Sequence, residues 1–327
     1  MRKFPFSVVA LLAVLLSDLI APFQQRQPAA IQAEAVALGT GARPVAAAPA
    51  GIAAKAWAIM DGKSGKLLWG FREAEARPIA STTKIMTAWI ILQRADKNPK
   101  WLDEDIRFSE RAAAVRGSSC RLKSGERLPV RELLYGLLLP SGNDAAVALA
   151  EHFGPRLQTG ETDNKDGDRL FVAEMNRQAK SMKLAETNFL DPHGLARNQA
   201  SARDLGVLTW HAMQNQQFRE YVKTRMHECE VRVEAETKRR VKWKNTNRLL
   251  EDASCDGVKT GTTKAAGACL VASAHKGSDH LIVVVLGSTS GDGRYEDSRK
   301  LLRWAWEQRG HRREKPENTK KRQPISY

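Results

Sequence analysis

Strand-like patterns of hydrophobic residues lie toward the two ends of the chain. At each end, two short apolar runs are separated by turn-forming residues, so each pair predicts a β-hairpin. A further segment alternates between apolar and polar residues, as a half-buried strand does. These predicted strands cover residues 56–61, 66–71, 227–236, 268–274 and 281–287.

Helical periodicity dominates the middle of the chain. Residues 82–94 carry apolar side chains on all sides, which predicts a buried helix with Ser81 at its N-terminal end. Strands at both ends with helices between them predict an α+β fold. In it, the N- and C-terminal strands form one antiparallel sheet, with flanking helices and a mostly helical subdomain. Apolar residues recur at three-to-four spacing in the other predicted helices, at 131–138, 144–153, 169–183, 202–215 and 295–308.

The N-terminal 35 residues have the pattern of a signal peptide. Arg2 and Lys3 precede an apolar run at 8–16, which is too short for a comfortable membrane span of roughly 20 residues. Cleavage after Ala35 fits the small-x-small pattern, and an uncleaved anchor is the alternative. The sequence therefore predicts export, with the protein periplasmic or otherwise extracytoplasmic, and either soluble or peripherally attached.

Composition divides the rest of the chain into three parts. Residues 36–52 are rich in Ala, Gly and Pro and are predicted to be a linker, and 53–307 form the predicted enzyme domain. The basic residues 308–327 are predicted to be a disordered tail that either contacts the wall or membrane electrostatically or is simply solvated. Within the domain, the polar segment 155–168 is predicted to be an exposed loop.

The chain has 52 Lys and Arg against 37 Asp and Glu, a net charge of +15. This excess favours anionic polymers or membrane surfaces, although a merely soluble basic surface is equally consistent with it. We predict no nucleic-acid partner. The four cysteines (Cys120, Cys229, Cys255 and Cys269) allow up to two disulfides or free buried thiols. They form no Cys-x-x-Cys, and His227-Glu228-Cys229 lacks the second histidine of a His-Glu-x-x-His helix, so we expect neither metal nor cofactor.

Three short motifs carry the candidate chemistry. Ser81 and Lys84 lie at positions i and i+3, where a hydroxyl and an amine reach each other on a helix. The lysine acts as a base only if burial or a nearby cation lowers its pKa from about 10.4. This spacing alone arises by chance about once in such a chain. Ser141-Gly142-Asn143 and Lys259-Thr260-Gly261 follow it in order, and the set is the signature of penicillin-recognising serine enzymes.

Between about Ala53 and Trp306 the sequence resembles the D-alanyl-D-alanine carboxypeptidases, low-molecular-mass penicillin-binding proteins of the peptidase S11 family. The resemblance implies a β-lactamase/DD-peptidase-like fold. Many members carry a further C-terminal β domain and an amphipathic helix, and we expect neither here. Besides the three motifs, it rests on Pro78-Ile79-Ala80, Gly117-Ser118-Ser119, 133–138, Asn143-Asp144-Ala145-Ala146, Met175-Asn176, 191–195, Asn245-Thr246-Asn247 and Asp256-Gly257-Val258.

The resemblance also implies roles for residues of the first two motifs. Ser81 is the expected acylated nucleophile, and Lys84 is its general base. Ser141 is expected to relay a proton to the leaving D-alanine, and Asn143 to hold a substrate amide.

The third motif is expected to bind the end of the substrate. Lys259 and Thr260 would hold the terminal carboxylate, and Gly261 would let the strand approach the substrate. The backbone amides of Ser81 and Thr262 form the expected oxyanion hole.

The implied function is a serine-type D-Ala-D-Ala carboxypeptidase that acts on peptidoglycan stem peptides and is inhibited by β-lactams. A DD-endopeptidase or a β-lactamase on the same fold, or a non-catalytic wall-binding protein, are the alternatives. A class A β-lactamase would carry Ser-Asp-Asn where this chain has Ser-Gly-Asn. His193 is interpreted as a turn residue and Asp144 as a helix cap, rather than as catalytic groups.

Overall fold

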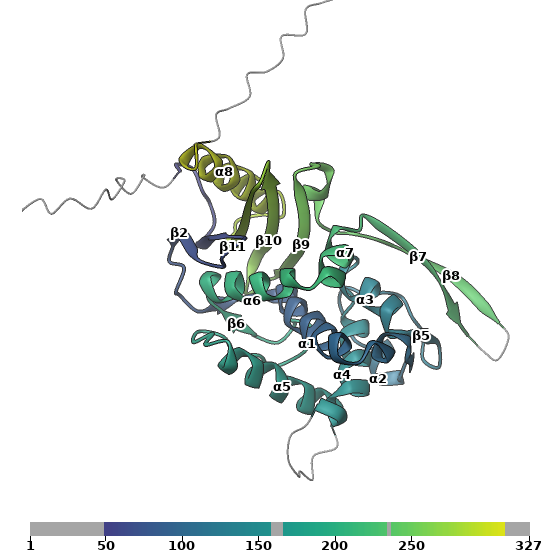
Figure 1. Cartoon of the computed structure of the whole chain (residues 1–327). Helices are drawn as coiled ribbons and strands as arrows, with labels where there is room; N and C mark the ends of the chain where they lie inside the picture. The colour runs from purple at the N-terminus through teal and green to yellow at the C-terminus, as the bar shows by residue number, and fades with distance from the viewer. Residues whose placement is uncertain (1–48, 158–165, 234–236, 311–327) are drawn as a thin grey trace, which may run out of the picture. The chain divides into compact units, whose positions relative to one another are not determined.

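Five antiparallel strands form the central sheet, in the order β2-β1-β11-β10-β9. β1 pairs with β11 from Ala56 opposite Leu286 to Asp61 opposite Leu281, so strands from the two ends of the domain lie side by side (Figure 1). The predicted α+β fold, with one sheet built from both ends, is confirmed. The strands are β1 (Ala56–Asp61), β2 (Leu67–Phe71), β9 (Cys255–Thr263), β10 (Gly267–Lys276) and β11 (Asp279–Ser288).

Side chains of the central sheet alternate between two hydrophobic cores. In β11, Val284 belongs to the core that also contains residues of α1 (Lys84–Lys97) and α6 (Ala202–Gln214). Its neighbour Val283 belongs to the second core, together with residues of α8 (Gly293–Gln308). Successive residues of a strand point to opposite faces, so helices covering both faces explain why this strand is apolar throughout.

Helices make up most of the region between the N- and C-terminal strands. α1 is buried along nearly all its length, as its apolar pattern predicted, and the predicted helices begin and end within about one turn of the observed ones. A short 3₁₀ helix, η1 (Ala80–Thr83), directly precedes α1. The remaining helices are α2 (Glu110–Ala113), α3 (Val130–Leu138), α4 (Asn143–Leu157), α5 (Gly167–Ser181) and α7 (Gln216–Lys223), with 3₁₀ helices η2 (Pro99–Asp103) and η3 (Arg248–Glu251).

A second sheet has four strands in the order β4-β5-β7-β8. At one edge of this sheet, β7 and β8 form a long projecting hairpin (Figure 1). The alternating segment predicted from residue 227 is β7. Its partner β8 was missed, because only Val241 and Trp243 are apolar among its basic residues. The strands are β4 (Asp105–Arg107), β5 (Arg127–Pro129), β7 (Met226–Arg232) and β8 (Lys238–Lys244), and β3 (Arg77–Pro78) pairs with β6 (Gln199–Ala200) elsewhere.

The computed structural model describes residues 49–157, 166–233 and 237–310. The predicted signal peptide and most of the predicted linker, polar loop and basic tail lie outside these residues. The predicted loop bounds of 155–168 are wrong at both ends, because residues 155–157 belong to α4 and α5 begins at Gly167. Within the described ranges, no helix combines the length and apolar character needed to cross a bilayer. All four cysteines are free thiols.

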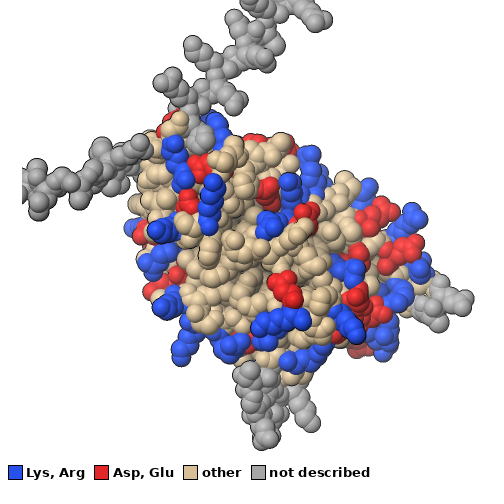
Figure 2. Space-filling model, viewed as in Figure 1, with Lys and Arg blue, Asp and Glu red and all other residues tan. Residues whose placement is uncertain are grey.

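Charged residues of both signs lie among one another on the face that Figure 2 shows. On the face shown in Figure 2, Lys and Arg lie mainly around the edge with Asp and Glu among them. On the β7–β8 hairpin, Lys238 pairs with Glu230 and Arg240 with Glu228. The basic excess is therefore not gathered into one patch on this face.

Candidate active site

Ser81 and Lys84 meet at the junction of η1 and α1. Ser81 lies in the 3₁₀ turn rather than in the helix proper, and Lys84 is the first residue of α1. Their spacing places Lys84 Nζ 3.1 Å from Ser81 Oγ, as the sequence predicted. Ala80, directly before the serine, has a φ of 48°, in the left-handed region that non-glycine residues seldom adopt. Such local strain is typical of functional turns.

The Lys84 side chain is fully buried and makes two further hydrogen bonds. Its Nζ donates to Asn143 Oδ1 at 2.7 Å and to the main-chain oxygen of His193 at 2.8 Å. Burial lowers the pKa of Lys84 to about 7, although the carboxylates of Asp191 and Asp144 act in the opposite direction. An ammonium ion is disfavoured in a low-dielectric site. Lys84 is therefore neutral in about half of the molecules near pH 7.

The turn at 191–196 presents the His193 oxygen to Lys84. The Asp191 carboxylate accepts hydrogen bonds from the backbone amides of His193, Gly194 and Ala196. Gly194 has a φ of 99°, and a Cβ atom there would lie 2.1 Å from the oxygen of Ala80. His193 therefore lies in a turn, as interpreted from the sequence, but its carbonyl contact with Lys84 was not foreseen.

Ser141-Gly142-Asn143 approaches the same amine from the start of α4. Ser141 has a φ of 66° and is buried, and its Oγ has no hydrogen-bond partner among the residues that the structure describes. Both polar atoms of the Asn143 amide are hydrogen-bonded. Oδ1 accepts from Lys84 Nζ, and Nδ2 donates to the oxygen of Arg116 at 2.7 Å. Asp144 lies in the first turn of α4, and it also accepts from Ser119 Oγ and the amide of Cys120. It therefore anchors the preceding loop.

Lys259-Thr260-Gly261 lies in β9, which passes directly beside η1. A Cβ atom at Gly261 would lie 2.9 Å from the amide nitrogen of Ser81, so the strand's approach to the serine requires glycine. Lys259 is buried and donates to the oxygen of Thr260 at 2.8 Å. Burial, with the charges of Lys84 and Arg294, holds the pKa of Lys259 well below its ordinary value.

Arg294, from the first turn of α8, is a site residue that sequence reasoning missed. Its Nη1 donates to Thr262 Oγ1 at 2.8 Å and to the oxygen of Gly261 at 3.2 Å. The predicted substrate-binding residue Thr262 is thus joined to a guanidinium. The other predicted substrate-binding threonine, Thr260, has its Oγ1 2.8 Å from Thr246 Oγ1. Arg294 belongs to no motif, and only its position at the start of a helix after the last strand could have pointed to it.

The structure thus brings the three motifs together. The Ser81 hydroxyl lies against a buried amine with a lowered pKa, and the Ser141 hydroxyl, without a partner among the described residues, lies in the neighbouring motif. The buried amine of Lys259 lies in the adjacent strand, and the Arg294 guanidinium lies against it. Such an arrangement can attack a carbonyl and bind an anionic group. No group of three metal-ligating side chains includes these residues within the described ranges.

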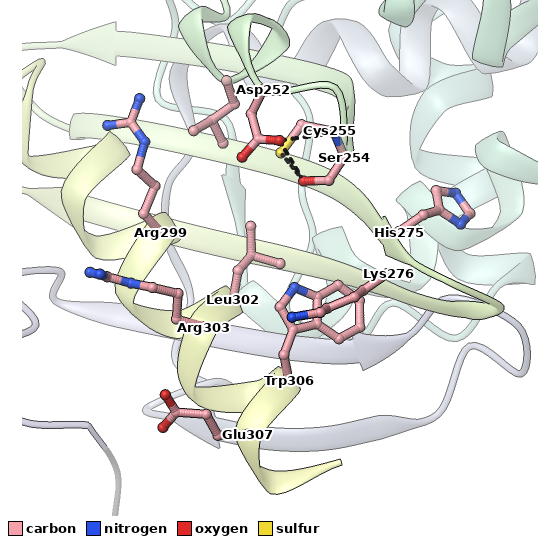
Figure 3. Close-up of a pocket in the computed structure, with 11 residues that line it drawn as sticks. Asp252, Ser254, Cys255, His275, Lys276, Arg299, Leu302, Arg303, Trp306 and Glu307 are labelled. Carbon is pink, nitrogen blue, oxygen red and sulfur yellow. Dashed lines mark hydrogen bonds between the residues drawn. The ribbon is translucent and has the colours of Figure 1, made fainter. Parts of the chain in front are cut away.

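A pocket of about 660 Å³ lies elsewhere, between α8 and the beginning of β9 (Figure 3). Cys255 and Ser254 line it, with sulfur and hydroxyl oxygen 3.9 Å apart. Burial raises the pKa of the Cys255 thiol to about 11, so the thiol stays protonated near neutrality. The pocket therefore offers no activated nucleophile, and it contains none of the predicted site residues.

Comparisons with known proteins agree with this geometry. The family model of D-alanyl-D-alanine carboxypeptidase, peptidase S11, matches residues 43–290. The D-alanyl-D-alanine carboxypeptidases DacF of Bacillus subtilis and DacD of Escherichia coli are 33% and 35% identical over 78% and 80% of this chain. These matches cover 62% and 65% of the two relatives, so the chain spans less than two thirds of their length.

A solved structure extends the similarity to the fold. The crystal structure of the DD-transpeptidase of Streptomyces strain K15 matches with a TM-score of 0.73 and 34% identity, covering 80% of this chain and all of that one. The predicted DD-peptidase-like fold is confirmed by this match. The chain belongs to the D-alanyl-D-alanine carboxypeptidase family, peptidase S11.

Proposed function

We propose that this protein is a serine-type D-Ala-D-Ala carboxypeptidase that acts on peptidoglycan stem peptides through an acyl-enzyme at Ser81. The observation that carries the proposal is the contact between Ser81 Oγ and the buried amine of Lys84. Family membership supplies the substrate class, since the matched relatives are named for this activity.

The hydrogen bonds of Lys84 suit it to act as the general base. A neutral amine has two N–H groups and one lone pair, and the two N–H groups have fixed acceptors in Asn143 Oδ1 and the His193 oxygen. The lone pair is then left for the Ser81 hydroxyl, 3.1 Å away. The amine accepts the hydroxyl proton as the serine oxygen bonds to the substrate carbonyl. Asn143, predicted to hold a substrate amide, thus also orients the base.

The other two motifs fit the end of a D-alanyl-D-alanine peptide. Arg294 provides positive charge for its terminal carboxylate, and the Thr260 hydroxyl and the Lys259 amine, whose pKa burial lowers, provide hydrogen-bond donors. The Ser141 hydroxyl, which lacks a partner in the described part of the chain, is the candidate to pass the proton to the leaving amine as the C–N bond breaks. The amides of Ser81 and Thr262 are the proposed oxyanion hole. Water then hydrolyses the acyl ester and releases the shortened peptide.

The substrate also implies where the protein works. We propose that residues 1–35 direct it out of the cytoplasm, where peptidoglycan is exposed, and that the basic tail 308–327 contacts anionic wall or membrane components. Removal of the tail should reduce co-sedimentation with cell walls at low salt and leave D-alanine release unchanged. Equal sedimentation with and without the tail would contradict the tail's role.

Labelling with fluorescent penicillin tests the nucleophile. Wild-type protein should be labelled covalently and Ser81→Ala should not, whereas Ser64→Ala, in the exposed β1–β2 turn, should be labelled like the wild type. Covalent labelling of Ser81→Ala would contradict the mechanism.

Mass spectrometry of products from a defined pentapeptide and a cross-linked dimer tests the reaction. Release of D-alanine from the pentapeptide is the expected result. Cleavage of the dimer alone would instead identify an endopeptidase, rapid hydrolysis of penicillin a β-lactamase, and wall binding without any product a non-catalytic protein.

A further inference from the structure

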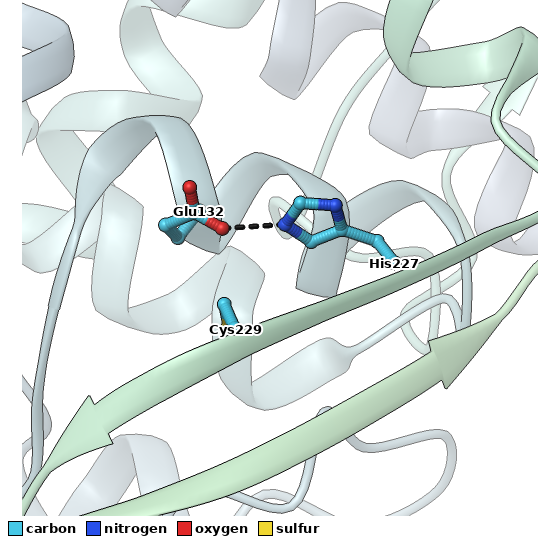
Figure 4. A group of neighbouring side chains, drawn as sticks. All are labelled: Glu132, His227 and Cys229. Atoms are coloured by element: carbon cyan, nitrogen blue, oxygen red, sulfur yellow. Dashed lines mark hydrogen bonds and ion pairs between the residues drawn. The ribbon is translucent and has the colours of Figure 1, made fainter.

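Three side chains with metal-binding atoms meet between α3 and β7, outside the candidate active site. Glu132 comes from α3, and His227 and Cys229 come from β7 (Figure 4). One ligand atom from each residue lies within 4.8 Å of the other two, and His227 Nε2 lies 2.5 Å from Glu132 Oε2. In the described part of the chain, no other His, Cys, Asp or Glu residues form such a group of three.

The geometry of β7 directs the side chains of His227 and Cys229 toward Glu132. His227 and Cys229 are two residues apart in β7, so both side chains project from the same face of the strand, and alternate residues such as Glu228 are exposed. The His227 ring stacks on Tyr135 at 3.6 Å between centroids and on Trp243 at 6.4 Å. The imidazole is therefore held in one orientation with Nε2 directed at the carboxylate.

We propose that Glu132, His227 and Cys229 bind a transition-metal ion, with Zn²⁺ as the best match. A thiolate, an imidazole and a carboxylate are all common zinc ligands, and three protein ligands leave a fourth tetrahedral position for water. All three side chains are partly exposed, which gives an ion access from solvent.

Binding requires only small side-chain movements. Ligand atoms around tetrahedral zinc are about 3.3–3.8 Å apart, given bond lengths of about 2.0–2.3 Å. The Glu132–His227 contact of 2.5 Å must therefore open by roughly 1 Å. The ion takes the place of the proton between Nε2 and Oε2, and both that proton and the thiol proton pass to solvent as the metal–ligand bonds form.

The cation that acts on Cys229 is engaged with another carboxylate. Arg239 is the basic residue whose charge reaches Cys229, and its guanidinium makes two hydrogen bonds of 2.6 Å with the buried Glu126. It therefore faces a different carboxylate. The sequence predicted no metal because the cysteines form no Cys-x-x-Cys and His227-Glu228-Cys229 lacks a second histidine. Glu132 lies 95 positions from His227 in the chain, so local spacing could not reveal it.

Zinc titration of the full chain by calorimetry, with metal analysis after desalting, tests the site. The expected result is one Zn²⁺ per chain. His227→Gln and Cys229→Ser each remove a ligand, so each should weaken binding by at least the roughly 10–100-fold typical for loss of an outer-shell partner. His152→Gln is the matched control, since His152 pairs with Glu104 at 2.8 Å but belongs to no such group of three. It should bind zinc like the wild type.

Cobalt substitution gives a second, spectroscopic readout. Co²⁺ bound by the thiolate should produce a near-ultraviolet sulfur-to-cobalt charge-transfer band, which Cys229→Ser should lack. Zinc binding that is equal in the wild type and in both ligand variants, or a cobalt complex without this band, would overturn the proposal.

Discussion

The buried amine of Lys84 predicts how acylation of Ser81 depends on pH. With a pKa of about 7 instead of the ordinary 10.5, the neutral fraction at pH 7 is about one half rather than about 0.03%. Burial thus increases the amount of active base by roughly 1,500-fold at that pH. Only the neutral form accepts a proton, so acylation should rise as pH increases. The expected gain is about 50-fold from pH 5 to pH 7 and only about twofold from pH 7 to pH 9.

The assay is the second-order rate constant for acylation by fluorescent penicillin, measured from pH 5 to pH 9 at constant ionic strength. The carboxylate of penicillin stays ionised over this range, so the reagent contributes no limb to the profile. Lys84→Met removes the amine while filling a similar volume in the buried site. This variant should react about 10²–10⁴-fold more slowly, and its residual rate should lose the limb near pH 7.

Lys259 also has a lowered pKa, so the limb must be assigned. Lys259→Arg keeps a positive charge throughout the range, because a guanidinium does not deprotonate in proteins. The limb near pH 7 should persist in this variant, even if the rate is lower. A wild-type rate that is flat between pH 5 and pH 7, or a limb that disappears in Lys259→Arg, would refute the assignment of Lys84 as the base.

Three further substitutions test separate parts of the structure. Gly194→Ala places a methyl group against the turn before the nucleophile at a positive φ, so unfolding experiments should show a loss of about 2 kcal/mol or more, with slower penicillin acylation. Arg294→Gln should raise KM about tenfold for a peptide with a free terminal carboxylate and leave an amidated peptide unaffected; equal effects on both would contradict a carboxylate-binding role. Arg239→Ala leaves the buried carboxylate of Glu126 without its partner and should cost about 2 kcal/mol in urea denaturation. Because the folded-state pKa of Glu126 is lowered, that difference should shrink as pH falls below the ordinary carboxyl range; a constant difference would contradict the ion pair.

Most of the main sheet could be predicted from the sequence, but its edge strand β9 and the strand β8 of the second sheet could not. β10 and β11 are continuous apolar runs because helices cover both faces, and such runs are visible in a single sequence. β9 carries Lys259-Thr260-Gly261, whose side chains serve the site rather than the core, so its pattern is not that of a strand. β8 is an edge strand with alternate basic residues, and its pairing with β7 depends on tertiary context.

The candidate site could be predicted as three motifs, but their joint geometry could not. The contact of Lys84 with Ser81 follows from helical spacing, which local sequence encodes. Its contacts with Asn143 and the His193 oxygen span 59 and 109 residues, and the second uses a main-chain atom that any residue would supply. No residue-type pattern marks such a contact.

The carboxylates of Asp191 and Asp144 hold segments of the site in place and also change the pKa of Lys84. Asp191 and Asp144 raise the pKa of Lys84, against a larger opposite effect of burial. Each also accepts backbone amides, Asp191 from the turn that holds the His193 oxygen and Asp144 from Cys120. Their charges are thus fixed at the distances that the loops impose. Since a Coulomb interaction depends on that distance, any shift of either loop changes both the position of Lys84 and the fraction of it that is neutral. Burial outweighs these two charges, and it is burial that lowers the pKa of Lys84 far enough for a lysine to serve as the proposed base near neutral pH.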